Sequence, residues 1–363
     1  MERRKFLKTA ATGAALAAPL AAPAIAQEAP VVRWRLTSGF PRSLDTIFGA
    51  AEIFAEHCKQ MSGGKIEIQV FPAGEIVPTP QAAEAVGTNT VEMAHTCSYY
   101  YWGKDPTFAL GTAVPFGLNA RLMNAWLFES GGNDLLNGFY AKHNLYGIPG
   151  GNTGVQMGGW WRKEINSVAD LEGVKMRIAG IAGKVMEKLG VVPQQIPGGD
   201  IYPALERGTI DAAEWIGPYD DQKLGFNKVA PYYYYPGFWE GGPTIHFFVN
   251  LEKWNALPDD YKAILINAGA YANTYMLARY DARNPGALRS LIAGGAQLKP
   301  FPQDVMEAAL QASNEVYEEI SATNPDFKAI WDNMRAFRSE GYLWLQVAEY
   351  SFDTFQIRNR TKG

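Results

Sequence analysis

One arginine in the middle of the chain constrains the fold most strongly. Arg177 lies in a short apolar run, residues 174–178, which has the composition of a β-strand. A glycine-containing turn, a helical stretch to Leu189 and a second apolar run at 191–196 follow. This order is typical of α/β units, whose strands lie inside the protein. A charged side chain in such a strand needs an anion, supplied by the protein or by a ligand.

The next unit repeats the pattern and ends on a carboxylate. Gly198-Gly199-Asp200 is expected to begin a helix with Asp200 as its N-cap, and Gly208 is expected to stop it. A strand is predicted over Thr209–Trp215, with Glu214 near its end. Open α/β sheets bind their ligands at the carboxyl ends of strands, so Glu214 is a candidate binding residue.

These residues resemble the solute-binding proteins of TRAP transporters, the DctP-like family. The resemblance is carried by Ser167–Arg177, Ala204–Gly208 and Thr209–Ala212, and it extends over essentially the whole mature chain. It is closest to the branch that binds 2-oxo acids such as pyruvate. The segments that match this branch are Tyr99–Pro106, Asn152–Gly159 and Tyr232–Gly237.

The resemblance implies both a fold and a role. The fold is α/β, a two-lobed periplasmic binding protein with a mixed sheet in each lobe and long helices crossing the lobes. The role is to capture a small 2-oxo monocarboxylate, pyruvate or a longer 2-oxo acid, and to deliver it to membrane permease subunits. The alternative kept open is an exported enzyme acting on a small organic acid. The four histidines stand in no catalytic or metal-binding motif, which gives this alternative little support.

Residues 1–26 have the pattern of an export signal. Arg3-Arg4-Lys5 precedes a small-residue apolar run, and Ala24-Ile25-Ala26 fits a cleavage site before Gln27. Paired arginines favour the twin-arginine route, with an ordinary secretory leader as the alternative. Either route predicts a periplasmic protein. No lipobox cysteine follows the leader and no later segment is apolar for long enough to span a bilayer, so no membrane anchor is expected.

Charge and cysteine content narrow the partners further. Without the leader the formal net charge is about −7, which disfavours nucleic acid. The only cysteines are Cys58 and Cys97, too few for a disulfide framework. Buried thiols are expected, with a single bridge left open.

The chain is long enough for two lobes with separate cores. Strands are predicted at 31–37, 65–71, 92–96 and 244–250, and helices at 46–61, 79–86, 258–292, 303–319 and 324–358. Lobe 1 is predicted to comprise 27–150 plus about 243–260, and lobe 2 to comprise 151–242 plus about 290–322. The helix over 258–292 should cross the lobes and kink at Asn284-Pro285.

The carboxy-terminal extension, 324–363, is rich in aromatic residues. It is expected either to cross both lobes or to be covered by a partner subunit. The resemblance to helix-swapped dimers supports a homodimer.

Arg177 is the first candidate for the substrate carboxylate. A planar guanidinium can donate two parallel hydrogen bonds to a carboxylate and stays charged inside a protein. The alternative is a salt bridge to an acidic residue of the chain itself. The resemblance favours ligand binding, because Arg177 stands at the substrate arginine of the family.

Three further polar side chains need partners if they are buried. Gln156 lies in an otherwise apolar run expected to be a strand, Glu214 ends another, and Glu240 lies between aromatic and glycine residues. A cross-strand hydrogen bond is the plain explanation for Gln156. By resemblance, these three side chains and the backbone carbonyl of Trp215 coordinate a cation beside the substrate.

The resemblance favours Na⁺ as this cation. Charge counting leaves Ca²⁺ open, because Ca²⁺ would neutralise a site that contains Arg177, two glutamates and a monocarboxylate. A 2-oxo acid offers the cation a carboxylate oxygen and a keto oxygen together. The remaining pocket wall is expected to contain Phe40, Tyr100, Tyr101, Asn152 and Trp215, although aromatic residues are often plain core.

Overall fold

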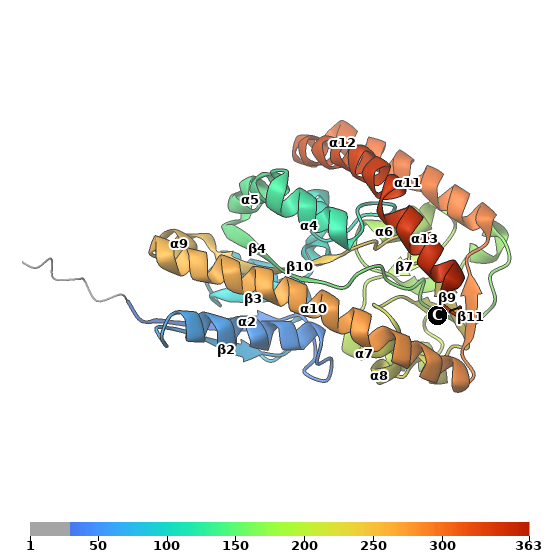
Figure 1. Ribbon diagram of the computed structural model, residues 1–363, viewed down its shortest axis with the longest axis horizontal. Helices are drawn as coiled ribbons and strands as arrows, with labels where there is room; N and C mark the ends of the chain where they lie inside the picture. Colours follow the sequence, from blue (N-terminus) through green and yellow to red (C-terminus); the bar gives the residue numbers. More distant parts are fainter. Residues whose placement is uncertain (1–29, 363) are drawn as a thin grey trace, which may run out of the picture. The chain divides into compact units, whose positions relative to one another are not determined.

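Two mixed β-sheets form the framework of residues 32–362 (Figure 1). The computed structural model describes residues 30–362, and the predicted leader at 1–26 lies outside them. Strands of the first sheet follow the order β2-β1-β3-β10-β4, in which β10 is antiparallel to both neighbours and β1 is parallel to β2 and β3. Their bounds are β1 (Val32–Ser38), β2 (Ile66–Phe71), β3 (Met93–Thr96), β4 (Leu145–Asn152) and β10 (Thr244–Asn250).

The second sheet has the order β11-β9-β5-β8-β6-β7. Within it β8, β6 and β7 are parallel, and β5 is antiparallel to β8 and β9. Their bounds are β5 (Trp160–Trp161), β6 (Lys175–Arg177), β7 (Val192–Gln194), β8 (Ala212–Ala213), β9 (Tyr232–Tyr235) and β11 (Gln297–Pro300). The core on this sheet contains Trp161, Met176 and Trp239. Together, the two sheets and their helices confirm the predicted α/β class.

The helices alternate with strands in the first two thirds of the chain and dominate the last third. The α-helices are α2 (Ile47–Met61), α3 (Ala82–Gly87), α4 (Ala120–Glu129), α5 (Gly132–Tyr140), α6 (Ile181–Lys188), α7 (Gly198–Glu206), α8 (Pro218–Leu224), α9 (Leu251–Asn255), α10 (Asp259–Ala293), α11 (Gln303–Thr323), α12 (Pro325–Val347) and α13 (Glu349–Asn359). Short 3₁₀ turns are η1 (Thr79–Gln81), η2 (Ser98–Tyr101), η3 (Pro106–Gly111), η4 (Ala141–His143), η5 (Val168–Leu171) and η6 (Phe226–Lys228). None of the helices within 30–362 is long and apolar enough to cross a membrane.

The long helix α10 joins elements of both sheets. It packs against α2 and β4 on the side of the first sheet and against α8, which follows β8 of the second (Figure 1). The helix continues through Pro285, so this proline does not end it. Helix α10 thus packs on strands of the first sheet and on a helix that follows a strand of the second, and its role in crossing the lobes stays a prediction.

Several predicted elements need correction. The strand expected over Thr209–Trp215 is reduced to Ala212–Ala213, so Glu214 follows the strand directly. Helix α7 begins at Gly198 with Pro197 as its N-cap, and Asp200 lies in its first turn instead of capping it. The predicted helix over 79–86 is a 3₁₀ turn followed by the short helix α3.

The expected strand around Gln156 is also absent. Residues 153–159 are irregular and connect β4 of the first sheet to β5 of the second. A second connection, 236–243, leads from β9 back to β10. These two connections touch, because the backbone N–H of Gln156 donates to Glu240 O at 3.0 Å and that of Gly237 donates to Gln156 O at 2.9 Å.

A glycine makes this approach possible. A Cβ on Gly237 would lie 2.6 Å from the carbonyl oxygen of Met157, closer than side chains tolerate. Cys58 and Cys97 are both free and buried, as expected in the absence of a bridge.

Candidate ligand-binding site

Arg177 and Glu214 are brought together by parallel strand pairing. Arg177 is the last residue of β6 and is paired with Ala213 of β8, so Glu214 is the next residue beyond that pair. Both side chains therefore leave the sheet at the carboxyl ends of neighbouring parallel strands, the edge at which α/β proteins bind ligands.

The guanidinium of Arg177 is held inside the protein by several acceptors. Nε donates to Ile196 O at 3.0 Å, and Nη1 donates to Glu214 O at 2.8 Å and to the Glu214 carboxylate. The guanidinium carbon, Cζ, lies 5.1 Å from the ring centre of Trp215, which is a cation–π contact. The side chain is 1% exposed. The internal ion pair that the sequence left as the alternative is thus present, and its acid is itself a predicted ligand residue.

The protonation of this arginine is secure. Burial by itself lowers the pKa of Arg177, but Glu214 and the other acidic neighbours, Glu240 among them, together outweigh burial and raise that pKa above its ordinary value. The guanidinium therefore stays charged. Its hydrogen bonds within the described residues use Nε and Nη1, which leaves the N–H groups of Nη2 for an entering carboxylate.

The residues predicted to hold a cation share an unusual property: their oxygens are buried without hydrogen-bond partners. This is true of Gln156 Oε1, Glu214 Oε2 and both carboxylate oxygens of Glu240. Buried carboxylates without partners are rare in proteins because desolvation is costly. Three side chains from separate segments therefore each have a buried oxygen that a hydrogen-bond donor or a cation could satisfy.

The raised pKa values of the two glutamates also favour a cation at this site. The pKa of Glu240 is raised well above its ordinary value, mainly by burial and further by the charge of Glu214, although Arg177 and the hydroxyl of Tyr99 oppose the increase. Burial also raises the pKa of Glu214, although Arg177 and the backbone N–H of Ala179, at 3.2 Å, oppose the increase. A bound cation would remove this penalty by favouring the charged carboxylates.

The amide of Gln156 is oriented by a neighbour that was not predicted. Its Nε2 donates to Oγ1 of Thr153 at 3.2 Å, and Oγ1 donates in turn to Gly154 O at 3.0 Å. Because Nε2 is engaged, Oε1 is the atom left for a cation. Thr153 is therefore part of the site through Gln156.

The oxygen set suits a hard cation. The part of the chain that the structure describes contains no group of three or more His, Cys, Asp or Glu side chains arranged to hold a metal ion. Glu214 and Glu240 supply two carboxylates, so amide and carbonyl oxygens must complete the coordination. Mixed oxygen ligands of this kind fit Na⁺ or Ca²⁺.

A small cavity of about 10 Å³ lies beside Gln156, whereas Arg177, Glu214 and Glu240 are not among the residues that line it. It brings together three predicted wall residues, Phe40, Tyr100 and Trp215, with Gln156. The lining residues that the sequence did not single out are Ile47, Cys97, Tyr99, Thr153, Ile216 and Ile245. The apolar members of this set make the wall largely hydrophobic.

Two predicted wall residues are placed differently. The hydroxyl of Tyr101 donates to Thr96 Oγ1 at 3.1 Å, and Tyr101 is not among the residues that line the cavity. The side-chain amide of Asn152 forms hydrogen bonds with backbone groups: its Nδ2 donates to Gly242 O and its Oδ1 accepts from Gly154 N, each at 2.9 Å. Asn152 therefore ties the two crossing connections together.

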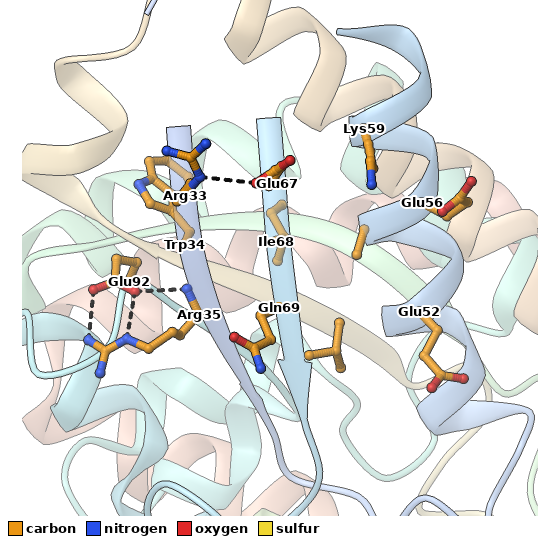
Figure 2. Close-up of a pocket in the computed structure, with 12 residues that line it drawn as sticks. Arg33, Trp34, Arg35, Glu52, Glu56, Lys59, Glu67, Ile68, Gln69 and Glu92 are labelled. Carbon is orange, nitrogen blue, oxygen red and sulfur yellow. Dashed lines mark hydrogen bonds and ion pairs between the residues drawn. The ribbon is translucent and has the colours of Figure 1, made fainter. Parts of the chain in front are cut away.

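A wider groove lies on the first sheet, away from these residues. It measures about 710 Å³ and is lined by β1, β2 and α2 (Figure 2). Both of its arginines are paired within the protein: Arg33 Nε donates to Glu67 at 3.1 Å, and Arg35 Nη2 donates to Glu92 at 2.8 Å. It lacks the unpaired buried oxygens that distinguish the site at Arg177.

A family model, DctP, the bacterial extracellular solute-binding protein family 7, matches residues 38–324. The chain belongs to this family. This DctP-family protein is 48% identical over 360 residues, 98% of its length and 99% of the relative's, to a monocarboxylate 2-oxoacid-binding periplasmic protein of Nostoc sp..

Solved structures agree with this assignment. A TRAP transporter solute-binding protein from Bordetella bronchiseptica is 52% identical, with a TM-score of 0.90 over 92% of this chain and 99% of that one. It is described as a mixed-occupancy dimer, with copurified calcium and picolinate bound in one active site and the other site apo. A TRAP periplasmic solute-binding protein from Pseudoalteromonas atlantica, with bound sodium and pyruvate, is 38% identical, with a TM-score of 0.85 over 88% of this chain and 98% of that one.

These findings confirm the predicted family, the two-sheet fold and the role as a solute-binding protein of a TRAP transporter working outside the cytoplasm. A binding protein of a transporter is not an enzyme, so the exported enzyme that the sequence left open is set aside.

Proposed function

We propose that this DctP-family protein captures a small 2-oxo monocarboxylate, with pyruvate as the simplest case, in the periplasm and delivers it to TRAP permease subunits. The observation that carries the proposal is the meeting of a buried charged Arg177 with unpaired oxygens of Gln156, Glu214 and Glu240. Relatives that bind 2-oxo acids, or pyruvate together with a cation, support it.

Arg177 would bind the carboxylate of the acid. Its Nη2 atom is the part of the guanidinium not engaged by the protein, and Trp215 covers the guanidinium face at 5.1 Å. A carboxylate there gains charge-assisted hydrogen bonds away from water. The apolar wall formed by Phe40 and its neighbours suits a short side chain on the acid and offers no second cation for a dicarboxylate.

Gln156 Oε1, Glu214, Glu240 and the backbone carbonyl of Trp215 would hold the cation. The cation supplies a positive charge that binds the keto and carboxylate oxygens of the acid together. Both Na⁺ and Ca²⁺ occur in related structures, Ca²⁺ with picolinate in one and Na⁺ with pyruvate in another. For this chain we propose Na⁺, with Ca²⁺ as the alternative that gives a neutral site.

Ligand entry would require the two sheets to separate. A cavity of about 10 Å³ holds no more than about one water molecule. The connections at 153–159 and 236–243 join the sheets and carry Gln156 and Glu240. We propose that these connections and α10 act as the hinge, and that the acid and the cation stabilise closure by contacts made from both halves.

Titration calorimetry on protein freed of cations tests the proposal. Pyruvate, 2-oxobutyrate, lactate and succinate are each titrated with Na⁺, with Ca²⁺ and with neither, and metal analysis of the purified protein identifies the cation it carries. Pyruvate binding that depends on one cation, with succinate not bound, supports the proposal. Equal pyruvate affinity with and without both cations contradicts the cation site, and preference for succinate contradicts the monocarboxylate assignment.

The carboxy-terminal helices support a homodimer. The side chains of Leu343, Trp344 and Val347 on α12 and of Phe352 and Phe355 on α13 are each about 59 to 67% exposed. Such a concentration of exposed apolar residues marks an interface. The related Bordetella protein is a dimer. Light scattering should show a dimer for the wild type and a monomer for Trp344→Asp with Phe355→Asp, whereas a monomeric wild type contradicts this part of the proposal.

A further inference from the structure

A polar cluster outside the cavity joins three elements through one carboxylate. Asp45 lies in the turn before α2. Its Oδ2 accepts a hydrogen bond from the hydroxyl of Tyr219 at 3.2 Å and from Nη2 of Arg279 at 2.5 Å, and its Oδ1 accepts one from Nζ of Lys223. One acidic group thus has two cationic donors and one neutral donor.

The donors come from different parts of the fold. Asp45 follows β1, and the adjoining helix α2 packs on β2 of the first sheet. Tyr219 and Lys223 belong to α8, which follows β8 of the second sheet. Arg279 belongs to α10, which contacts both α2 and α8. Asp45 therefore connects the first-sheet side to the second-sheet side directly.

The same segments carry residues of the binding cavity. Phe40, in the β1–α2 connection with Asp45, makes an edge contact with Trp215 at 6.4 Å between ring centres. Trp215 stands shortly before Tyr219 and Lys223 in the chain. Movement that separates Phe40 from Trp215 must also draw Asp45 away from α8, because short stretches of chain connect each pair.

We propose that Asp45, Tyr219, Lys223 and Arg279 form a latch that holds the protein closed around its ligand and sets the rate of ligand release. This inference rests on the proposed function. None of the four residues lines the cavity, and as a latch they act by positioning the two halves.

The charges of the latch favour the closed form. Asp45 is 42% exposed at its side chain, and Lys223 and Arg279 are 29% and 27% exposed. Burial alone raises the pKa of Asp45, but hydrogen bonds from Lys223 and Arg279 more than offset it and lower that pKa below its ordinary value. In the open form these groups would be hydrated separately, so their attraction belongs to the closed form alone.

An interaction made only after closure should affect release more than capture. We therefore expect Asp45→Asn to raise the dissociation rate of pyruvate by roughly 3- to 20-fold, with an association rate within about twofold of wild type. Raising the salt concentration from about 0.05 to 0.5 M should accelerate release from the wild type more than from Asp45→Asn, because salt screens partly exposed charges.

Stopped-flow tryptophan fluorescence measures these rates. Asp45→Asn and Lys223→Met are each compared with the control variant Glu52→Gln. This control removes a different ion pair, in which Arg42 Nη1 donates to Glu52 at 2.7 Å and both residues lie on the first-sheet side. Faster release in both latch variants, non-additive in the double variant, and no change in Glu52→Gln support the latch. Unchanged release in Asp45→Asn overturns it.

A second measurement separates failure of the latch from failure of the proposed function. If the wild type binds no pyruvate, the proposed function fails, but spin labels at Gln69→Cys on β2 and Lys175→Cys on β6 still report closure. Both positions are exposed, and the native cysteines are buried. Longer distances between the labels in Asp45→Asn than in the otherwise identical protein support the latch, and identical distance distributions overturn it.

Discussion

Replacing Arg177 with lysine should weaken ligand binding while leaving the fold intact. Lysine retains a positive charge for Glu214, but it cannot also reproduce the bond from Nε to Ile196 O at 3.0 Å and the N–H pair of Nη2. A hydrogen bond to a charged group contributes about 1.5 to 3 kcal/mol. Losing one such bond to the ligand should lower pyruvate affinity by roughly 10- to 100-fold.

Alanine at this position is a harsher test. It leaves Glu214, 0% exposed, without its cationic partner. Breaking a buried ion pair in this way destabilises proteins by about 3 to 5 kcal/mol, and a similar loss of binding energy corresponds to about two to four decades in affinity. Since Arg177→Ala can also impair folding, the lysine variant is the decisive one.

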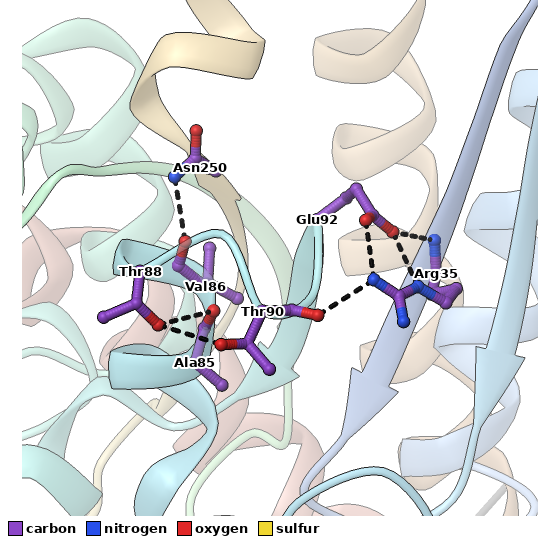
Figure 3. A network of polar contacts seen from close by, with 7 residues as sticks. All are labelled: Arg35, Ala85, Val86, Thr88, Thr90, Glu92 and Asn250. Atoms are coloured by element: carbon purple, nitrogen blue, oxygen red, sulfur yellow. Dashed lines mark hydrogen bonds and ion pairs between the residues drawn. The ribbon is translucent and has the colours of Figure 1, made fainter.

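A matched control exists on the first sheet. Arg35 donates to Glu92 with Nε at 3.1 Å and Nη2 at 2.8 Å, and Nη2 also donates to Thr90 O at 2.8 Å (Figure 3). This pair is more exposed, with the Arg35 side chain 47% accessible, so Arg35→Lys should change the free energy of unfolding by less than about 1 kcal/mol. It should leave pyruvate affinity unchanged.

Calorimetric titration gives the affinities, and chemical denaturation confirms that each variant is folded. Wild-type pyruvate affinity in folded Arg177→Lys would contradict a role of Arg177 in binding the carboxylate, and so would an equal loss of affinity in Arg35→Lys.

Three further predictions concern the cation and the buried acids. Glu240→Gln should remove most of the cation dependence of pyruvate binding. It should also raise the melting temperature of the cation-free protein, because it removes a buried carboxylate whose oxygens have no hydrogen-bond partner. Thr153→Val should free the amide of Gln156 and lower cation affinity about 10- to 100-fold by titration, with little change in fold. Burial raises the pKa of Asp220 and of Asp221 from 3.8 to about 7. The free energy of unfolding should therefore fall as pH rises from about 4 to 7. Denaturation curves measured over this range should show a smaller pH dependence for Asp221→Asn than for the wild type.

Proton binding by Asp220 and Asp221 sets the direction of this pH dependence. Between these pH values the folded protein holds protons on the two aspartates that the unfolded chain has released, so increasing pH favours unfolding. A slope unaffected by Asp221→Asn contradicts the assignment. Cation dependence retained in Glu240→Gln, or wild-type cation affinity in Thr153→Val, would likewise count against the proposed ligand set.

Much of the order of elements, and the candidacy of Arg177 and Glu214, could be predicted because they depend on local patterns. Arg177 was distinguished by its charge within an apolar run, and Glu214 by its place after a strand. Parallel pairing of two short strands then places the two side chains together.

Other features depend on contacts that local patterns do not contain. Residues 98–101 form a 3₁₀ turn, whose geometry sets the direction of each side chain. Tyr99 and Tyr100 line the cavity, whereas the hydroxyl of Tyr101 donates to Thr96. Asn152 was expected to serve the ligand, but its amide binds backbone from a distant segment. The latch at Asp45 joins residues far apart in sequence, which only the folded chain brings together.

A crystal structure of the protein with pyruvate and either Na⁺ or Ca²⁺ would test the central claim most directly. We predict the carboxylate of pyruvate on Arg177 and a cation coordinated by Gln156 Oε1, Glu214 Oε2 and the Glu240 carboxylate, whose oxygens otherwise lie buried without partners. Pyruvate bound elsewhere, for instance in the groove of Figure 2, or bound at Arg177 with no cation between the two glutamates, would contradict it.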